Sequence, residues 1–167
     1  LPYEVPEEKS VLIENAYDLS FSASPPQTSK EEKIFLWAGR PITLKNLPLL
    51  IRVFERVTQK GIPARLECVT GISHAELMRK VRESYAMILP SFSDVSPNVI
   101  LDGIREGKPF IMTKHTGIVE RLPGAGFFIN PENEEEILQA IISMCREETY
   151  AQCQDALSKI HYTHSYT

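Results

Sequence analysis

Short apolar runs recur along the chain from Lys33 onward, and polar or amphipathic stretches separate them. Continuous apolar runs of about 4–8 residues are typical of strands that are buried on both faces of a parallel sheet. We therefore expect strands at the segments KIFLWA, AMILP, FIMT and FFI, with a further strand at ARLECV, in a sheet of about five or six strands.

The stretches between these runs carry helix signals. Apolar residues recur at helical spacing over positions 50–57, and Gly61 ends that helix. Ser73 precedes a second helix as its N-cap, because a glutamate follows at the spacing of a capping box. Ser96 and Pro97 open a third helix, in which we expect Ser96 to be the cap and Pro97 the first helical residue.

Strands and helices alternate, which predicts an α/β fold: a Rossmann-like, doubly wound parallel sheet with right-handed crossovers. Two more polar-faced helices follow from about residue 130. Prolines punctuate residues 1–32, which we interpret as an N-terminal arm or linker with one short strand at 11–13. Residues 33–167 then form the folded domain. Because the chain begins at Leu1 rather than Met, we expect it to be a piece of a longer protein.

Composition narrows the class of protein. The 167 residues are 43% hydrophobic, and no apolar run reaches the length of a membrane span. The formal net charge of -4 argues against nucleic acid as a partner. Three cysteines, an odd number without metal-site spacing, favour a reduced cytoplasmic compartment. His161 and His164, together with Cys145 and Cys153, do not match the spacing of a zinc site, so we assign them to a terminal helix and expect no metal.

Polar residues follow the predicted strands where each strand ends. In open α/β sheets, ligands bind outside the carboxyl ends of the strands. Glycine, arginine, serine and aspartate collected at one rim suggest a small polar, anionic ligand, although strand ends commonly lead into polar loops. The segments concerned are Gly39-Arg40, Thr70-Gly71, Ser91 to Asp94 and Thr113 to His115.

Two cations lie at the mouth of the predicted sheet. Arg40 follows the first strand of the domain directly, and Lys45 precedes the next helix. An arginine fork and a lysine point charge together neutralise a diphosphate well. The alternative is a pair of solvated surface cations. Neither a G-x-G-x-x-G fingerprint nor a Walker loop is present to support phosphate binding.

Two carboxylates flank the start of the third helix. Asp94 falls in the loop before it, and Asp102 falls about one and a half turns into the helix. Carboxylates accept hydrogen bonds from sugar hydroxyls, and the amides near Asn98 at the helix start favour an anion. The alternative is an acidic residue favoured by the helix dipole and an ordinary exposed helical aspartate.

These segments together resemble a known family. LPSFSDVSPNVILDGIREGKPFIMTKHTGIVERL resembles the signature of retaining GT-B glycosyltransferases of the family 4 (group 1) type, which runs roughly P-S-x-x-E-G-F-x-x-x-x-x-E-A-x-A-x-G-x-P-V-I-A. AGRPITLKNLPLLIRVFERV is similar to the family's G-R-x-x-x-x-K-G helix entry, and GISHAEL to its G-x-V-x-x-x-E-L loop. The matches cover nearly the whole chain in the right order and imply the C-terminal, donor-binding half of a GT-B fold.

The resemblance implies a role for each matching position. Arg40, Lys45 and Asp94 correspond to the catalytic positions: the two cations hold the donor diphosphate, and the aspartate contacts the transferred sugar. Asp102 corresponds to the carboxylate that holds the ribose. The remaining donor-binding positions lie in the loops and helix start beside the base, sugar and diphosphate, and they are Gly39, Gly71, Ile72, Ser96, Asn98 and Val99.

The implied activity is hexosyl transfer with retention, from a nucleotide-diphospho-sugar to a glycan, lipid or protein acceptor that is held mainly by a missing N-terminal domain. The isolated domain is then inactive or weak. No cofactor or metal is expected, and the chain contains no Asp-x-Asp motif. The location implied is cytoplasmic, and a peripheral position at the inner membrane face of the full-length protein stays open.

The chain departs from the family pattern in three places. Both motif glutamates are aspartates, and Val95-Ser96 replaces the usual Gly-Phe. The family's additional strand and helix before TGISHAEL have no room here, so the sheet is one unit smaller or a loop is omitted. These departures motivate an alternative, a non-catalytic module that keeps the fold for binding or assembly. A receiver- or flavodoxin-like domain is disfavoured, because Gly39-Arg40 stands where its acidic cluster belongs.

Overall fold

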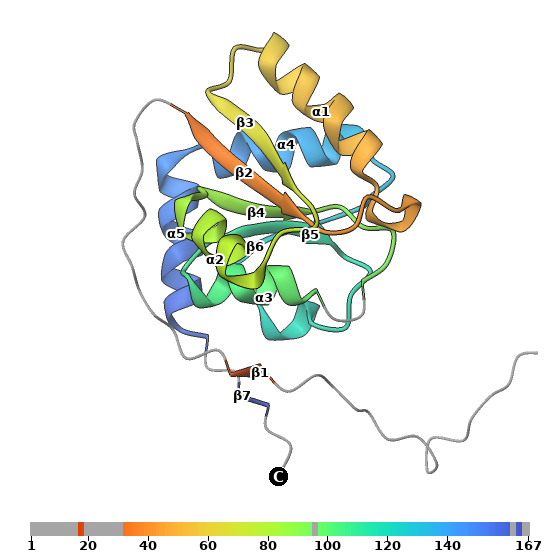
Figure 1. Ribbon diagram of the computed structural model, residues 1–167. Coiled ribbons are helices and arrows are strands. Elements are labelled where there is room, and N and C mark those ends of the chain that lie inside the picture. Colours follow the sequence, from red (N-terminus) through yellow and green to blue (C-terminus); the bar gives the residue numbers. More distant parts are fainter. Residues whose placement is uncertain (1–16, 19–31, 95–96, 161–162, 165–167) are drawn as a thin grey trace, which may run out of the picture.

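The computed structural model describes residues 17–18, 32–94, 97–160 and 163–164. Its main element is a parallel sheet with the strand order β3-β2-β4-β5-β6 (Figure 1). The strands match the predicted segments, and the Rossmann-like α/β fold is confirmed. Their bounds are β2 (Lys33–Ala38), β3 (Ala64–Val69), β4 (Ala86–Leu89), β5 (Phe110–Thr113) and β6 (Gly126–Ile129).

Helices cover both faces of this sheet (Figure 1). On one face α1 (Leu47–Gln59) packs beside α4 (Glu134–Met144), and α5 (Glu147–Ser158) packs on α4. On the other face α2 (His74–Glu83) packs beside α3 (Asn98–Arg105). Two short 3-10 helices, η2 (Thr43–Lys45) and η3 (Val119–Arg121), follow β2 and β5. The strands β1 (Tyr17–Asp18) and β7 (Thr163–His164) form a separate antiparallel pair.

The core lies between the sheet and its helices. Every residue of β4 and β5 is buried, as expected for central strands with a helix layer on each side. The buried stripe of α1 is the one that the spacing predicts, and it consists of Leu50, Val53, Phe54 and Val57. Gly61 ends this helix in a left-handed conformation with φ of 68°, which a residue without a Cβ adopts at little cost.

Two buried tyrosines, Tyr85 just before β4 and Tyr150 in α5, fix α5 against the sheet. Their rings stack with centroids 4.1 Å apart. The Tyr85 hydroxyl donates to the Met144 carbonyl at 2.9 Å, and the Tyr150 hydroxyl donates to the Tyr85 carbonyl at 2.9 Å. Burial raises the pKa of both phenols, so both stay protonated and keep donating at any physiological pH.

Three expectations differ from the structure or fall outside it. Pro97 is the N-cap of α3 and not its first helical residue: its ψ of 72° is not helical, while its carbonyl accepts the first hydrogen bonds of the helix. His164 lies in β7 and not in a terminal helix, because α5 ends at Ser158. The expected cap Ser96, His161 and most of the arm at 1–32, including its short strand, lie outside the described residues.

Ser73 caps α2 as predicted, with its Oγ accepting a hydrogen bond from the Glu76 amide at 3.2 Å. Ser73→Ala removes that acceptor and leaves an amide of the first turn without its partner. We expect the free energy of unfolding to fall by about 1 kcal/mol, measured by urea denaturation. Ser73→Asp is the matched control, since aspartate also caps, and it should stay near the wild-type value. Equal stability of the alanine and aspartate variants would contradict the assigned cap.

The order of the strands sets where a ligand site can form. The chain runs from β2 outward to β3, then returns past β2 to β4 and continues outward to β5 and β6. The winding direction therefore reverses between β2 and β4, and in such sheets the crevice at the reversal is the usual place for a ligand. The same order leaves β3 at one edge of the sheet. Among the helices of the described residues, none combines the length and apolarity needed to cross a bilayer.

Candidate functional site

The loops that follow β2 and β4 meet at the reversal of the winding direction. Lys45 ends η2 in the first loop, and Asp94 lies in the second. Lys45 Nζ is 2.6 Å from Asp94 Oδ2, and both side chains are largely shielded, with 24% and 10% of their surfaces exposed. Two residues that the sequence separates by 49 positions thus form one ion pair at the rim. The structure brings these two predicted site residues together.

Backbone contacts hold the two loops in place. The Phe92 amide donates to the Leu44 carbonyl at 2.9 Å, which joins the β4 loop to η2. The Asp94 amide donates to the His115 carbonyl at 3.1 Å, which joins it to the loop after β5. Ser91 is fully buried, and its Oγ lies 3.5 Å from Asp94 Oδ2, at the outer limit of a hydrogen bond. The carboxylate is therefore positioned by three strand ends.

Asn46 anchors the loop that carries Lys45, and it was not predicted as a site residue. It adopts a left-handed conformation with φ of 53°, which asparagine tolerates better than most residues. Its buried side chain donates to the Pro131 carbonyl at 2.7 Å, which ties the loop to the segment before α4. The signal was present in the sequence, because the family's K-G entry is Lys45-Asn46 here. An asparagine in place of that glycine indicates a positive φ.

Four other predicted site residues follow β2 and β3 at the same end of the sheet, and they are Gly39, Arg40, Gly71 and Ile72. Arg40 is exposed just beyond β2, and Gly39 is tied to β3 through its amide, which donates to the Val69 carbonyl at 3.2 Å. Gly71 follows β3 with φ of 67°, and the half-buried Ile72 comes next. The structure places Arg40 at the same end of the sheet as Lys45 and Asp94, and within the described part of the chain no ion pair joins it to either of them.

The third helix contributes its first turn to this rim. α3 begins at Asn98, four positions after Asp94, and its N-terminus carries the partial positive charge of the helix dipole. Val99 is half-buried. Asp102 lies one turn after Asn98 and is only 8% exposed. It is therefore not the exposed helical aspartate of the alternative interpretation. Its burial comes from the packing of α3 in the fold and not from the local sequence.

Two buried polar atoms near the carboxyl ends of the strands have no hydrogen-bond partner within the described part of the chain. They are Nε1 of Trp37, at the end of β2, and Oγ1 of Thr116, in the loop after β5. An unmatched buried donor or acceptor costs about 1–3 kcal/mol, which a hydroxyl or water that reaches it recovers. Both atoms belong to loops or strand ends on the side of the sheet where a polar ligand is expected.

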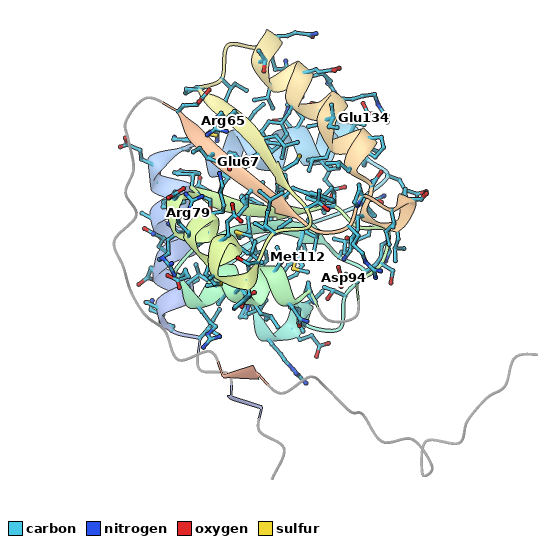
Figure 2. The ribbon with its side chains drawn as sticks, viewed as in Figure 1. Arg65, Glu67, Arg79, Asp94, Met112 and Glu134 are labelled. Carbon is cyan, nitrogen blue, oxygen red and sulfur yellow. The ribbon has the colours of Figure 1, made fainter. Side chains whose placement is uncertain are left out.

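The arrangement suits an anion with attached hydroxyl groups. Lysine, arginine and a helix N-terminus attract negative charge, and the largely shielded Asp94 accepts hydrogen bonds. The contacts also place a cation and an acid on two neighbouring loops. Figure 2 shows Asp94 at the end of the sheet, well apart from the charged pair Arg65 and Glu67 on β3.

Comparison with solved structures shows the same fold at low sequence identity. The apo form of lipopolysaccharide outer core galactosyltransferase WaaB aligns with a TM-score of 0.67 at 15% identity, over 90% of this chain and 51% of that chain. Sucrose-phosphate synthase from Thermosynechococcus elongatus aligns with a TM-score of 0.66 at 14% identity, over 87% and 47%. TarM aligns with a TM-score of 0.66 at 14% identity, over 89% and 36%.

The chain thus spans about half or less of the length of each of these structures. The expected half of a GT-B fold is confirmed at the level of fold. A search of curated proteins gave no significant match. The family model described as glycosyl transferases group 1 matches residues 32–147, well over half of the chain and all five strands of the main sheet. This protein therefore belongs to the group 1 glycosyl transferases.

Proposed function

We propose that this chain is the donor-binding half of a retaining hexosyltransferase that uses a nucleotide-diphospho-sugar. The observation that carries the proposal is the Lys45–Asp94 pair of 2.6 Å at the reversal of the sheet, in a member of the group 1 family. A cation and a carboxylate side by side suit a donor in which a diphosphate and a sugar are adjacent. Arg40, the turns at Gly39 and Gly71, and α3 complete the proposed site.

In this proposal the reaction breaks the bond between the anomeric carbon and the diphosphate and forms a new bond to an acceptor hydroxyl oxygen, whose proton passes to the departing diphosphate. Positive charge develops on the sugar ring, and negative charge develops on the departing diphosphate. Lys45 and Arg40 stabilise the departing charge, where positioned electrostatics contribute most. Asp94 accepts hydrogen bonds from the sugar, and Asp102 from the ribose. The cations replace a metal ion in this role, and the chain contains no Asp-x-Asp motif.

The acceptor, a glycan, lipid or protein, is held mainly by an N-terminal domain in this proposal. The isolated chain then binds donor and transfers sugar poorly or not at all. The comparisons support this division, because the chain aligns with about half or less of each structure. A cytoplasmic location is part of the same proposal and is supported by the three unpaired cysteines without metal-site spacing.

A second candidate function is a non-catalytic module that keeps the fold. The ion pair itself favours it, because Asp94 already neutralises the lysine that a diphosphate needs. Titration calorimetry with UDP, GDP and ADP separates the two functions. Binding of one nucleotide with a dissociation constant on the order of micromolar supports the donor site and identifies the base. Absence of binding by all three favours the module.

Arg40→Ala tests whether the second cation holds the diphosphate. We expect the dissociation constant of the preferred nucleotide to rise about tenfold, because one charge-assisted hydrogen bond is worth about 1.5–3 kcal/mol and this side chain is exposed. Thermal stability should not change. Arg40→Lys keeps the charge without the fork and should give an intermediate affinity. Unchanged affinity in the alanine variant removes Arg40 from the site.

A further inference from the structure

The strand β3 lies at the edge of the main sheet, and within the described residues no strand pairs with its outer side. Among the described strands it pairs only with β2. The Lys33 amide donates to the Pro63 carbonyl, and the Gly39 amide donates to the Val69 carbonyl. The backbone N–H and C=O groups of the odd-numbered residues of β3 therefore point toward β2. Even-numbered residues therefore direct their N–H and C=O groups outward, because these directions alternate along a strand. The outward amides belong to Leu66 and Cys68, while the Ala64 amide donates to the Ile62 carbonyl.

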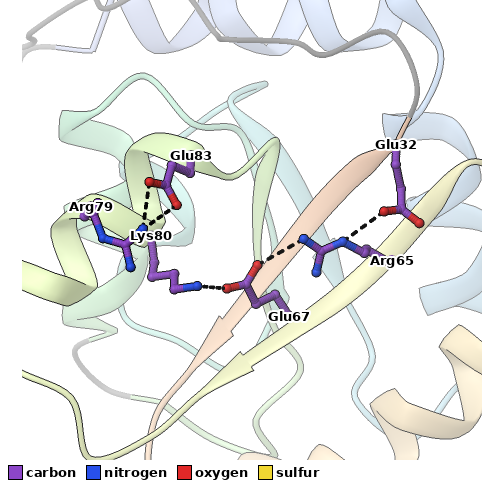
Figure 3. A network of polar contacts seen from close by, with 6 residues as sticks. All are labelled: Glu32, Arg65, Glu67, Arg79, Lys80 and Glu83. Carbon is purple, nitrogen blue, oxygen red and sulfur yellow. Dashed lines mark hydrogen bonds and ion pairs between the residues drawn. The ribbon is translucent and has the colours of Figure 1, made fainter.

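The charges along this edge are opposite in sign and two positions apart. Arg65 and Glu67 lie on the same face of β3, and Figure 3 shows them joined in a chain of ion pairs. Glu32 contacts Arg65 at 3.0 Å, Arg65 contacts Glu67 at 3.4 Å, and Glu67 contacts Lys80 on α2. The hydrogen bond from Lys80, together with the charge of Arg65, lowers the pKa of Glu67 against its partial burial, so this carboxylate stays ionised.

This charge pattern is complementary to itself in one antiparallel register. When two β3 strands meet about a twofold axis at Leu66, Arg65 of each copy lies directly opposite Glu67 of the other. The same register places Leu66 opposite Leu66 and Ala64 opposite Cys68, which are the residues whose backbone groups point outward. Arg65 and Glu67 then occupy the non-hydrogen-bonded positions, where side chains approach most closely. The outward backbone groups and the side-chain charges thus favour the same register, in which Leu66 lies opposite Leu66.

We propose that β3 is a self-association edge, through which two copies of this chain pair antiparallel and join their sheets with Arg65 opposite Glu67. The occupant of the edge is a second copy because a single strand supplies both the outward backbone groups and the complementary charges. Charged side chains on an edge strand ordinarily discourage pairing. In this register each charge lies opposite one of the other sign, and opposite-charge cross-strand pairs are stabilising. The inference does not depend on the proposed function.

The test exchanges charges and mixes the variants. Arg65→Glu gives a strand with two acidic residues, and Glu67→Arg gives one with two basic residues. Each variant alone places like charges opposite one another twice per dimer, so we expect its dimer dissociation constant, measured by analytical ultracentrifugation, to rise about tenfold or more over wild type. An equimolar mixture of the two restores both opposite pairs, and we expect a heterodimer of near wild-type affinity.

Arg79→Glu is the matched control for loss of a surface ion pair. Arg79 lies on α2 and contacts Glu83 at 2.8 Å, so the variant changes charge near β3 without touching its edge (Figure 3). Its association should equal that of wild type. Circular dichroism of all variants confirms that each one is folded. In wild-type protein, amide hydrogen exchange at Leu66 and Cys68 should slow as concentration rises.

Three results would overturn the proposal. One is a wild-type chain that stays monomeric at every concentration tested. The second is self-association of the two β3 variants with the affinity of wild type, which places the contact on another surface. The third is a mixture that associates no better than its separate components, which excludes the register.

Discussion

Replacing Lys45 with alanine should raise the dissociation constant for the preferred nucleoside diphosphate by about tenfold to a hundredfold. The substitution removes a cation whose side chain is three-quarters shielded, and a charge-assisted hydrogen bond is worth about 1.5–3 kcal/mol. The effect should exceed that of Arg40→Ala, since Arg40 is more exposed to solvent and so more strongly screened. Titration calorimetry measures both variants against the same nucleotide.

Asp94→Asn is the informative partner of this variant. It keeps the shape of the side chain and removes the charge that holds Lys45 at 2.6 Å. We expect it to bind the nucleoside diphosphate more tightly than wild type does. In wild type, Lys45 must break its ion pair with the Asp94 carboxylate before it contacts the diphosphate, and in the variant no such ion pair exists. A donor with its sugar attached should lose part of that gain. If both variants bind as wild type does, the diphosphate does not lie at this pair and the proposed function fails.

Replacing Gly126 with alanine should lower the free energy of unfolding by about 3 kcal/mol. A Cβ at this position would lie 2.2 Å from the Phe110 carbonyl oxygen and 2.8 Å from its ring. Phe110 is the register partner of Gly126 in the β5–β6 pair, so relief requires the two strands to separate. The ring of Phe110 also packs against Phe128, with centroids 5.4 Å apart, which limits its movement.

Gly39→Ala is the control for this stability measurement. An added Cβ there lies 3.8 Å from the nearest atoms of Trp37, which is ordinary contact, so unfolding in urea should shift little. Gly103 is a useful intermediate: its added Cβ would lie 2.3 Å from Met87 Cγ, and a flexible methionine side chain moves more readily than a backbone carbonyl. A Gly126 variant as stable as the Gly39 variant would contradict the backbone clash.

The elements of the fold were predictable because their signals are local. The strands β2, β4, β5 and β6 coincide with apolar runs, and Ser73 begins α2 with the hydrogen bond that the capping pattern implies. Helix starts that depend on a precise ψ were less predictable. Pro97 has the φ of a helical residue by its ring, yet its ψ of 72° makes it the N-cap.

The candidate site was predictable as a set of strand ends but not as a set of contacts. The residue types at Arg40, Lys45, Asp94 and Asp102 suggested an anionic sugar ligand, and the family resemblance assigned each a role. The sequence carried no indication that Lys45 is bound by Asp94 before any ligand arrives. It also left Asp102 open to an exposed interpretation, whereas the side chain is buried.

The sequence by itself determined the kind of protein: its apolar runs and capping residues indicate an α/β domain, and its match to the family signature identifies the group 1 glycosyl transferases. Only the tertiary structure decided which strand ends are neighbours. Strand order is a property of contacts between residues far apart in the chain, and these contacts placed β2 beside β4 and left β3 at the edge. The Lys45–Asp94 pair and the open side of β3 both follow from that order, because no local pattern fixes which strands lie side by side.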